Sequence, residues 1–452
     1  MRVKLPDGVK DQVAHIKGGI HPDYNKNTHN SEPVTMPSPK TVRLPVSMHI
    51  GTACEPIVKV RDKVGLGQVI ADSTSRISSP IHATVSGTVK SIREGDVTSS
   101  GSKVLIIEIE SDGEMRPYEG LKVPEIRSKE NFIKAVRDSG VVGLGGAGFP
   151  TSAKLDTPPG ITIDTLVVNG AECEPYITVD DYAMNNDIEP FFIGLTNTMK
   201  WLNIDRAIIG IEDNKVEAMQ NLLSYIKKDP ALDIKKNIDV VSFKAQYPQG
   251  AEKIIIYQTT GRKVPVGKLP HDVGVLVLNV NTLLEIGIFI STGMPLLTRL
   301  ITVDGSAVRT PMNVVVPFGT SIAEVLDFVG LRENPSLVIM GGPMMGVAVS
   351  SLDKTIIKQN NALLALTEKD YSLADESECI RCAHCIDHCP MHLQPTSIMK
   401  ALKKDEMDKV MDLQVMACIE CGCCDYVCPA KIPLVHYMRS AKTKVRELGG
   451  HK

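Results

Sequence analysis

The sequence predicts a multidomain protein of the α/β plus β class that ends in a helical, cysteine-rich region. Three observations lead to this prediction. The chain has 452 residues, enough for several domains of ~100–200 residues each. Short β-branched runs fill its first quarter and then alternate with helix-like runs. Nine of its 11 cysteines lie between Cys379 and Cys428.

The composition excludes several classes of protein. Hydrophobic residues make up 43% and charged residues 23%, which is a globular mixture and not that of a disordered chain. A net charge of −3 and an aromatic content of 4% argue against a nucleic-acid partner. No apolar run approaches the ~18 residues of a membrane-spanning helix. The N-terminus also lacks the apolar core of a signal peptide, so we expect a cytoplasmic chain with no transmembrane span of its own.

Residues 1–115 are rich in predicted strands. The runs 58–71, 81–92 and 103–110 are β-branched or alternating and are separated by turn residues. This pattern resembles the lipoyl/biotinyl barrel-sandwich fold, in which a lysine on the central hairpin carries the prosthetic group. The corresponding segment here, residues 73–80, contains no lysine. We therefore predict a barrel-sandwich-like N-terminal domain with a structural role.

Residues 116–290 show the alternation of strands and helices that indicates a Rossmann-like α/β domain with a mainly parallel sheet. A helix is expected at 129–138 and is followed by a glycine loop at 140–151. The other expected elements are strands at 165–169, 207–211, 238–243 and 273–278 and helices at 190–202 and 215–228.

The remaining residues divide into two predicted units. Residues 291–350 contain two strands, a helix and a further strand, which suggests a small β-grasp (SLBB-like) module. Residues 351–452 are expected to form a helical, ferredoxin-like domain, with helices at 395–403 and 434–448.

Two copies of one cysteine motif dominate that last unit. Each copy has the spacing C-x2-C-x2-C-x3-C-P, which is the run found in bacterial ferredoxins. The copies comprise Cys379, Cys382, Cys385 and Cys389, and then Cys418, Cys421, Cys424 and Cys428. Zinc is the alternative, but a zinc site needs only four Cys or His ligands and does not require this spacing twice.

In two-cluster ferredoxins the fourth cysteine of a motif ligates the other cluster. We therefore assign one [4Fe–4S] cluster to Cys379, Cys382, Cys385 and Cys428, and a second to Cys418, Cys421, Cys424 and Cys389. The three cysteines outside the pattern are expected to be free thiols; they are Cys54, Cys173 and Cys423.

Two clusters joined to an α/β domain indicate electron transfer. The clusters move single electrons, so the α/β domain must supply a two-electron partner, for which a flavin is expected. The glycine-rich residues 143–148 can bring backbone N–H groups close to a phosphate. They follow a helix and not a strand, so they do not match the dinucleotide-binding fingerprint.

A longer string is more specific. Residues 143–154, followed by residues 168–175, resemble the flavin-binding subunit of respiratory complex I. Residues 247–253 and 278–282 resemble further segments of that family in the same order. The whole layout, with Lys-Gly-Gly-Ile-His-Pro at residues 17–22, is more similar to the RnfC/RsxC family, which belongs to the Rnf ion-translocating ferredoxin:NAD oxidoreductase complexes.

The resemblance implies an FMN- and NADH-binding domain over residues 116–290. The residues expected to line the FMN phosphate and ring are Gly143, Gly145, Gly146 and Gly148, with Lys154 balancing its charge. Those expected to hydrogen-bond FMN are Asn169, Glu172, Asn279 and Thr282. Those expected on the NADH side are Phe149, stacked on the adenine, and Glu174 and Glu252. Ala171 and Ala251 stand where the family has acidic residues.

The resemblance therefore implies an NADH/FMN/iron–sulfur subunit that is peripheral on the cytoplasmic face of the cell membrane. Hydride would pass between NAD and FMN, with no catalytic side chain required, and single electrons would pass through the two clusters. The implied partners are the other subunits of an Rnf-type membrane complex, including a ferredoxin-like iron–sulfur subunit. Two alternatives remain open: a soluble cobalamin reductase of a bacterial microcompartment, and a docking or scaffold subunit with a vestigial flavin site.

Overall fold

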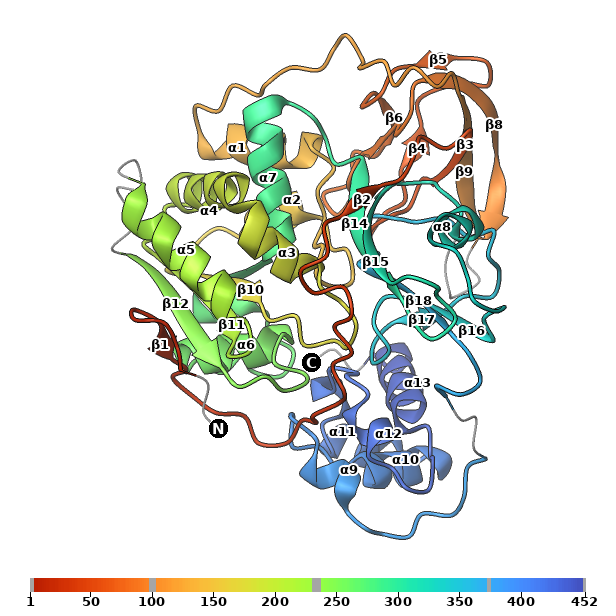
Figure 1. Cartoon of the computed structure of the whole chain (residues 1–452). Coiled ribbons are helices and arrows are strands. Elements are labelled where there is room, and N and C mark those ends of the chain that lie inside the picture. Colours follow the sequence, from red (N-terminus) through yellow and green to blue (C-terminus); the bar gives the residue numbers. More distant parts are fainter. Residues whose placement is uncertain (1–3, 97–102, 230–236, 372–374, 450–452) are drawn as a thin grey trace.

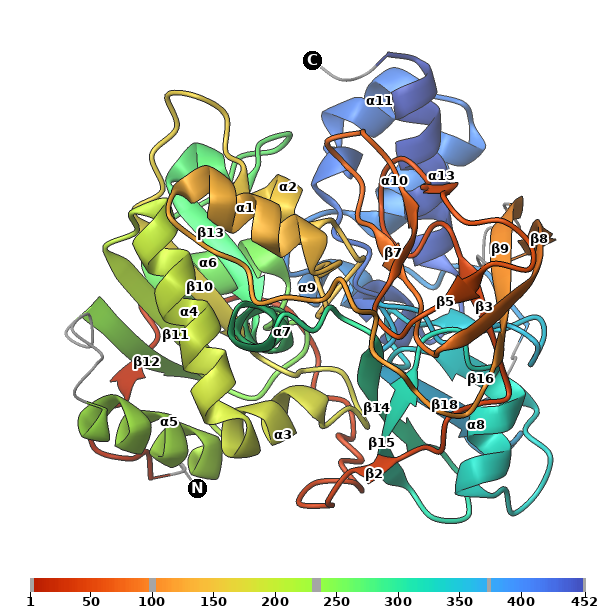
Figure 2. The same cartoon turned by 90° about the horizontal axis from the view of Figure 1, so that it is seen from above.

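The computed structural model describes residues 4–96, 103–229, 237–371 and 375–449. In Figure 1 an N-terminal β domain, an α/β domain and a six-stranded sheet lie above a helical, cysteine-rich domain. Seen from above in Figure 2, the α/β domain occupies one side of the molecule, and the β domain and the six-stranded sheet occupy the other. Within the described ranges, no helix combines the length and the hydropathy needed to cross a membrane.

The N-terminal β domain consists of two antiparallel sheets. Its strands are β3 Thr41–Pro45, β4 Glu55–Pro56, β5 Lys63–Val64, β6 Val69–Asp72, β7 Ile81–His82, β8 Gly87–Asp96 and β9 Lys103–Ser111. They are ordered β3-β9-β8-β5 and β4-β6-β7. Alternate residues of β3 and β9 point inward, so Val42, Leu44 and Ile107 are fully buried in the core. Residues 73–80 join β6 to β7.

The α/β domain is built on a parallel five-stranded sheet ordered β1-β12-β11-β10-β13. Its strands are β1 Lys10–Asp11, β10 Thr165–Gly170, β11 Arg206–Glu212, β12 Ile238–Phe243 and β13 Val275–Asn279. Its helices are α1 Lys129–Asp138, α2 Thr151–Leu155, α3 Val179–Asn186, α4 Ile188–Leu202, α5 Val216–Lys228, α6 Glu252–Thr260, η2 Pro270–Val273 and α7 Val280–Thr292. The four longer strands and the helices α1, α4 and α5 lie where the sequence predicts them.

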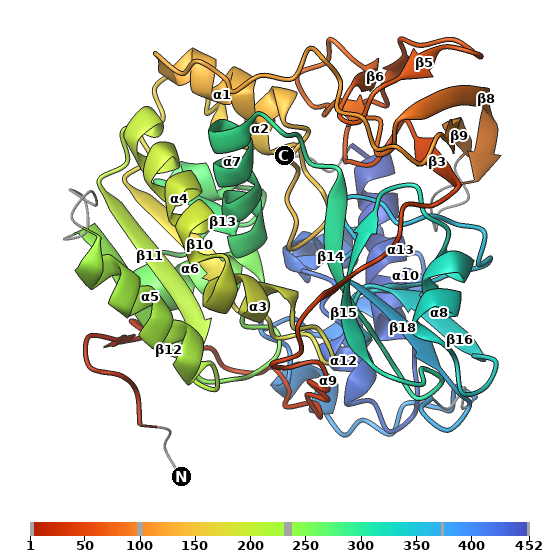
Figure 3. The same cartoon turned by 45° about the horizontal axis from the view of Figure 1, so that its top comes forward.

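The two faces of this sheet are covered by different helices. Leu166 and Val168 of β10 belong to the core that also contains residues of α4, α5 and α7, while Val167 packs with Ile255 and Ile256 of α6. The alternation arises because successive side chains of a strand point to opposite faces. Figure 3 shows α4, α5 and α7 over one face of the sheet.

The six-stranded sheet is ordered β17-β16-β18-β14-β15-β2. Its elements are β2 Val34–Thr35, β14 Thr298–Asp304, β15 Met312–Pro317, α8 Ile322–Val329, β16 Leu337–Met340, β17 Val347–Ala348 and β18 Ala362–Leu366. A capping box between Ser321 and Glu324 starts α8. The sheet extends beyond the predicted 291–350 at both ends, because β18 pairs with β14 and β2 pairs with β15.

The cysteine-rich domain consists of short helices in two similar halves. They are α9 His384–Asp387, α10 Pro395–Lys403, α11 Met407–Asp412, η3 Val415–Ala417, α12 Cys423–Tyr426 and α13 Leu434–Glu447. In each half a single helical turn within the cysteine motif is followed by a longer helix that begins five residues after the motif's proline. The two longer helices, α10 and α13, pack against each other.

Residues 4–36 do not belong to the sheets of the N-terminal β domain. Strand β1 is an edge of the α/β sheet and β2 is an edge of the six-stranded sheet. Between them the chain passes close to the cysteine-rich domain, as the red trace in Figures 1 and 3 shows. The sheet pairing thus divides the region predicted as one unit, 1–115, among three parts of the molecule.

Candidate cofactor sites

The carboxyl ends of the parallel strands meet the glycine loop at one edge of the α/β sheet. Strands β10 and β13 end beside each other at the pair Asn169 and Asn279. The loop is held there by two contacts of Leu144: its N–H donates to the Thr282 hydroxyl at 3.0 Å, and its carbonyl accepts from Arg299 at 2.7 Å. This edge is where ligands bind in open parallel sheets.

The geometry of the glycine loop fits a phosphate or a flavin edge. Gly145 and Gly146 are exposed. A Cβ on Gly145 would lie 2.6 Å from Nδ2 of Asn279, whereas a Cβ on Gly146 would meet nothing within 4 Å. Gly143 closes the loop by donating its N–H to the Phe149 carbonyl at 2.9 Å. Close approach of backbone to a ligand is the reason that such loops use glycine.

The side chains of Asn169 and Asn279 shape the edge of the site. Asn169 donates to the Gly250 carbonyl at 2.8 Å and accepts the N–H of Ala171 at 3.1 Å. Asn279 caps helix α7 and donates to Asp180 at 2.8 Å. Both amides therefore hold neighbouring segments in place, and Asn169 joins the strand end to the segment that begins α6.

Lys154 and Glu252 form an ion pair between helices α2 and α6. Lys154 lies on α2, directly after the glycine loop, and Glu252 is the first residue of α6. Their Nζ and Oε1 atoms are 2.5 Å apart, with 29% and 41% of the side chains exposed. The predicted phosphate-balancing cation thus has a carboxylate partner and remains accessible to a ligand.

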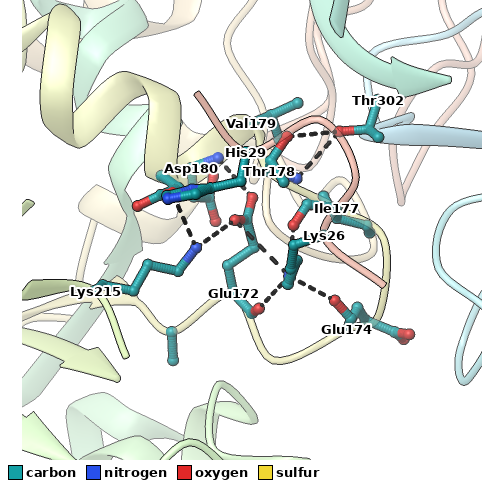
Figure 4. Close-up of polar contacts among 12 residues, drawn as sticks. Lys26, His29, Glu172, Glu174, Ile177, Thr178, Val179, Asp180, Lys215 and Thr302 are labelled. Carbon is teal, nitrogen blue, oxygen red and sulfur yellow. Dashed lines mark hydrogen bonds and ion pairs between the residues drawn. The ribbon is translucent and has the colours of Figure 1, made fainter. Parts of the chain in front are cut away.

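The other two predicted acids lie in a polar network that fixes their loop (Figure 4). One oxygen of Glu172 accepts the N–H of Asp180 at 2.7 Å, and the other accepts from Lys215 at 3.1 Å. Both oxygens of Glu174 accept backbone N–H groups, those of Met344 at 3.0 Å and Met345 at 2.9 Å. Both acids are thus held by contacts within the chain.

Sequence reasoning missed the cations and acids that surround Glu172. Lys26 and Lys215 come from segments distant in sequence, whereas Asp181 follows Glu172 closely and lies on α3. Lys215 lies 3.4 Å from Asp181. Burial alone would lower the pKa of Lys215, but Glu172, Asp181 and Glu212 outweigh it and the net shift is upward. No local pattern marks these residues, because the strands and loops that bring them together are far apart in the sequence.

Glu212, at the carboxyl end of β11, was also not predicted from the sequence as a site residue. It is fully buried, and neither carboxylate oxygen has a hydrogen-bond partner among the described residues. Burial raises its pKa to about 7, although Lys26 and Lys215 act in the opposite direction. This carboxyl group, at the edge of the sheet where the parallel strands end, therefore titrates close to neutral pH.

The eight motif cysteines surround two separate cavities. One is lined by Cys379, Cys382, Cys385 and Cys428, and the other by Cys389, Cys418, Cys421 and Cys424. Each cavity thus receives three thiols from one motif and the fourth from the other. Within the described ranges, no three His, Cys, Asp or Glu side chains stand close enough together to hold a single metal ion.

The two cysteine loops have left-handed residues at matching positions. Arg381 and Ala383 have φ near +60°, and the matching positions of the second motif, Glu420 and Gly422, are also left-handed. These turns direct successive thiols toward one cavity. Backbone N–H groups point at sulfur in each half, from Leu393 to Cys389 and from Glu420 to Cys418. Such N–H···S bonds tune the potential of an iron–sulfur cluster.

The cavity that contains Cys421 adjoins the α/β domain. The Tyr247 hydroxyl donates to the Cys421 carbonyl at 2.7 Å. Tyr247 also packs in one apolar cluster with Cys173, Cys421 and Cys423. Cys423 lines the cavity but lies outside both motifs. The apolar residues around the other cavity, among them Met399 and Leu434, all come from the cysteine-rich domain.

Comparison with known proteins agrees with this organisation. Three family models match: the RnfC barrel sandwich hybrid domain over residues 14–114, the Nuo51 FMN-binding domain over 136–287 and a 4Fe-4S dicluster domain over 372–429. The chain is therefore similar in turn to a barrel-sandwich domain, an FMN-binding domain and an iron–sulfur domain, in the order that the sequence predicts.

Three relatives are similar over nearly the whole chain, and each is the C subunit of an oxidoreductase complex. The chain is 41% identical to that of the Na(+)-translocating ferredoxin:NAD(+) oxidoreductase complex of Acetobacterium woodii, over 95% of this chain and 97% of that protein. It is 40% identical to that of the proton-translocating ferredoxin:NAD(+) oxidoreductase complex of Clostridium ljungdahlii, over 96% and 94%. It is 36% identical to that of the ion-translocating oxidoreductase complex of Rhodobacter capsulatus, over 98% and 85%.

Proposed function

The chain belongs to the RnfC family, the C subunits of ion-translocating ferredoxin:NAD(+) oxidoreductase complexes, and from this premise we propose that it is the NADH-oxidising or NAD-reducing electron-transfer subunit of such a complex. It binds FMN and iron–sulfur clusters, and its partners are the other subunits of the complex. When bound, FMN supplies the conversion between two-electron hydride chemistry and one-electron transfer.

The observation that carries the proposal is the contact between the two candidate cofactor sites. Within the segment 247–252, the Tyr247 hydroxyl donates to the carbonyl of Cys421, which lines a thiol cavity, and Glu252 pairs with Lys154 at the candidate flavin site. Gly250, within the same segment, accepts the hydrogen bond from Asn169. One short stretch of chain therefore joins the candidate flavin site to the candidate cluster site, as electron transfer between them requires.

The chain's own residues bind and orient the cofactor. The exposed backbone of Gly145 and Gly146 would receive the phosphate or ring edge, with Gly143 and Gly148 shaping the turn. Lys154 would balance the added negative charge. Asn169, Asn279 and Thr282 would act chiefly by holding the strand ends and the loop, given the hydrogen bonds they already make. Phe149, whose carbonyl accepts the Gly143 N–H at the end of the glycine loop, and Glu252 are assigned to the NADH side.

Glu172 and Glu174 receive a different role in this proposal from the one the resemblance implies. Their carboxylates are engaged by Lys215 and by backbone N–H groups. We therefore assign them to fixing the loop beside the site, and not to direct contact with FMN or NADH. Hydride transfer needs orientation and a suitable electrostatic environment more than a proton-transferring side chain.

The two thiol sets would hold two [4Fe–4S] clusters with cross-paired ligands. The set with Cys421 adjoins the α/β domain, so its cluster would exchange electrons with the flavin. The apolar residues packed around the set with Cys382 come from the cysteine-rich domain itself, and Cys382 is exposed. That cluster would exchange electrons with a partner, for which we propose a ferredoxin-like subunit.

The finer fold and location follow from the same proposal. We assign the α/β domain as Rossmann-like, the six-stranded sheet with α8 as a β-grasp (SLBB-like) module, and the cysteine-rich domain as ferredoxin-like. The relatives' names, as subunits of translocating complexes, support a peripheral position on the membrane. The use of NADH supports its cytoplasmic face.

Anaerobic purification followed by iron, sulfide and flavin assays tests the function. We expect about eight iron atoms and eight sulfides per chain, together with one FMN. Addition of NADH should bleach the flavin absorbance first and the cluster absorbance afterwards. Iron and sulfide without flavin or NADH-dependent bleaching would contradict the proposal and favour a scaffold role. Rapid bleaching with cobalamin as the sole acceptor would instead favour a corrinoid reductase.

A further inference from the structure

The segment Gly18 to His29, called the strap below, runs along the boundary between the α/β domain and the cysteine-rich domain. At its start, the N–H of Gly19 donates to the His388 carbonyl at 2.9 Å, next to the ligand candidate Cys389. The side-chain amide of Gln246 donates to the Gly18 carbonyl at 2.6 Å. The strap therefore contacts the cysteine loop and the α/β domain within two residues.

The next residue pairs with the segment that joins the two cofactor sites. Ile20 and Tyr247 exchange both backbone hydrogen bonds, at 2.8 and 2.9 Å. Tyr247 is the residue whose hydroxyl reaches the Cys421 carbonyl. The strap thus touches both motifs that line the cavity beside the flavin site, one directly at His388 and one through Tyr247.

The middle of the strap carries a lysine that organises the loop beside the flavin site (Figure 4). The ammonium group of Lys26 donates to three backbone carbonyls, those of Glu172 at 2.9 Å, Glu174 at 2.8 Å and Ile177 at 2.5 Å. Only 15% of its side chain is exposed. Three carbonyls converging on one buried cation hold a loop in a single conformation, since each would otherwise lose a hydrogen bond.

The end of the strap is anchored to two further elements. The amide of Asn27 donates to Asp304 of β14 at 3.1 Å, and the hydroxyls of Thr28 and Thr178 are 2.6 Å apart. His29 lies 2.8 Å from Asp181 of α3. Both ends of the strap are therefore fixed, and its length cannot change without breaking contacts to several parts of the molecule.

We propose that the strap is a positioning element that sets the separation between the flavin site and the cluster held by Cys389, Cys418, Cys421 and Cys424. This inference rests on the proposed function. Gly19 holds the cysteine loop, Gly18 is held by Gln246 of the α/β domain, and Lys26 holds the loop at 172–177, so one continuous segment ties the two sites together. The rate of electron transfer between two centres falls steeply with their separation, so a small loosening of the strap slows that step.

The two glycines show how closely the strap approaches its neighbours. Gly18 and Gly19 have φ of +82° and +80°. A Cβ on Gly18 would lie 2.9 Å from the Cys389 carbonyl, and one on Gly19 would lie 2.6 Å from the Tyr247 carbonyl. A side chain at either position must push the strap away from rigid backbone.

The test compares Gly19→Ala with Gly160→Ala. Gly160 has nearly the same φ, +83°, but a Cβ there meets nothing within 4 Å. Both substitutions strain the backbone equally, and only the first opens the boundary. A second variant, Gln246→Ala, loosens the strap without adding any atom.

We expect Gly19→Ala and Gln246→Ala to keep the iron and flavin content and the rate of flavin bleaching by NADH. Cluster bleaching should then slow several-fold relative to wild type, because electron transfer from the flavin to the cluster becomes slower as the two centres move apart. Amide hydrogen exchange, measured without NADH, should rise in residues 384–392 and 244–250 of these two variants and not in Gly160→Ala.

Lys26→Met tests the other anchor of the strap. It removes the cation from three carbonyls, so we expect weaker flavin retention with unchanged iron content and faster exchange in residues 172–177. Lys10→Met is the matched control, because Lys10 lies in the same N-terminal region but pairs with Asp239 at the surface.

Unchanged exchange and wild-type cluster bleaching in Gly19→Ala and Gln246→Ala would overturn the inference. Absence of NADH-dependent bleaching in the wild-type protein would instead contradict the proposed function. In that case the exchange measurements still decide whether the strap holds the two domains together.

Discussion

The hydroxyl of Tyr247 donates a hydrogen bond of 2.7 Å to the backbone carbonyl of Cys421. This bond joins the α/β domain to a loop that lines a thiol cavity, and Tyr247 is almost fully buried there. We expect Tyr247→Phe to keep both cofactors but to weaken the contact by about 0.5–1.5 kcal/mol. Hydrogen exchange in residues 418–424 should rise. Tyr118→Phe, at an exposed position in another part of the chain, is the control, and equal behaviour of the two variants would contradict this role.

We expect substitutions at two adjacent glycines, Gly145 and Gly146, to affect protein stability and FMN affinity differently. A Cβ on Gly145 would lie 2.6 Å from Asn279, while one on Gly146 would meet open space. We expect Gly145→Ala to lower both the stability of the flavin-free protein and its FMN affinity. Gly146→Ala should leave that stability unchanged and lower only FMN affinity, because its methyl group would project into the space needed by the cofactor. Thermal unfolding and FMN fluorescence titration measure the two effects. Full FMN binding by Gly146→Ala would show that the cofactor does not approach this residue.

We expect removal of the Lys154 charge and removal of the Glu252 charge to have different effects on FMN affinity. Loss of a charge-assisted hydrogen bond of about 1.5–3 kcal/mol corresponds to roughly a 10- to 150-fold weaker FMN affinity, which we expect for Lys154→Ala. Iron content should not change. Glu252→Gln removes the competing carboxylate, so FMN affinity should stay the same or rise. Lys134→Ala, on the exposed face of α1, is the control. Equal losses in Lys154→Ala and Glu252→Gln would mean that the intact pair, and not the lysine charge, supports binding.

Double substitutions test the cross-pairing of the cysteines. Cys389→Ser with Cys418→Ser alters one cavity, so about four of the eight irons should remain. Cys389→Ser with Cys379→Ser alters both cavities, although both residues belong to the first motif, and little iron should remain. Cys423→Ser changes a thiol that lines a cavity without belonging to either motif, and about eight irons should be kept. Iron retained in the same-motif variant and lost in the cross-motif variant would refute the cross-pairing.

Glu212 should make stability depend on pH in a defined direction. Burial raises the pKa of Glu212 to about 7, above the 4.5 expected when unfolded. Between these two pH values the folded state therefore binds more protons than the unfolded state. The stabilisation of the folded state that arises from the raised pKa of Glu212 is complete below pH 4.5 and is lost as the pH rises toward 7. Glu212→Gln removes this dependence. Its stability relative to wild type should rise by on the order of 1–3 kcal/mol from pH 5 to pH 7.5. Anaerobic thermal unfolding measures it, with the exposed Glu217→Gln as control; a constant difference across this range would contradict the assignment.

Much of the fold was predictable because it depends on local pattern. Apolar periodicity located α1 at Lys129–Asp138 and the four longer strands of the parallel sheet. The repeated cysteine spacing led to the two sets of four thiols that line the cavities. Burial and turn geometry within a short segment determine which residue types that segment contains. Helices, strands and cysteine loops of this kind can therefore be predicted from the sequence alone.

The surroundings of the candidate flavin site were not predictable in this way. Lys26, Lys215 and Glu212 carry no motif, and their meeting with Glu172 depends on strands and loops far apart in the chain. Glu172 and Glu174 match the family's string, yet the structure engages both carboxylates in contacts within the chain. A motif specifies residue types at a spacing, whereas hydrogen-bond partners depend on what other segments bring nearby.

The sequence by itself determined the classes of chemistry: eight cysteines at cluster spacing, a glycine loop and an alternating α/β region. Only the tertiary structure decided how these parts are joined. In the folded chain the N-terminal region is divided among three parts of the molecule. The strap contacts His388 and Tyr247 and then reaches the loop at 172–177 through Lys26. The physical reason is that hydrophobic periodicity and ligand spacing act over a few residues, while non-local pairing becomes favourable only when the whole chain has folded around it.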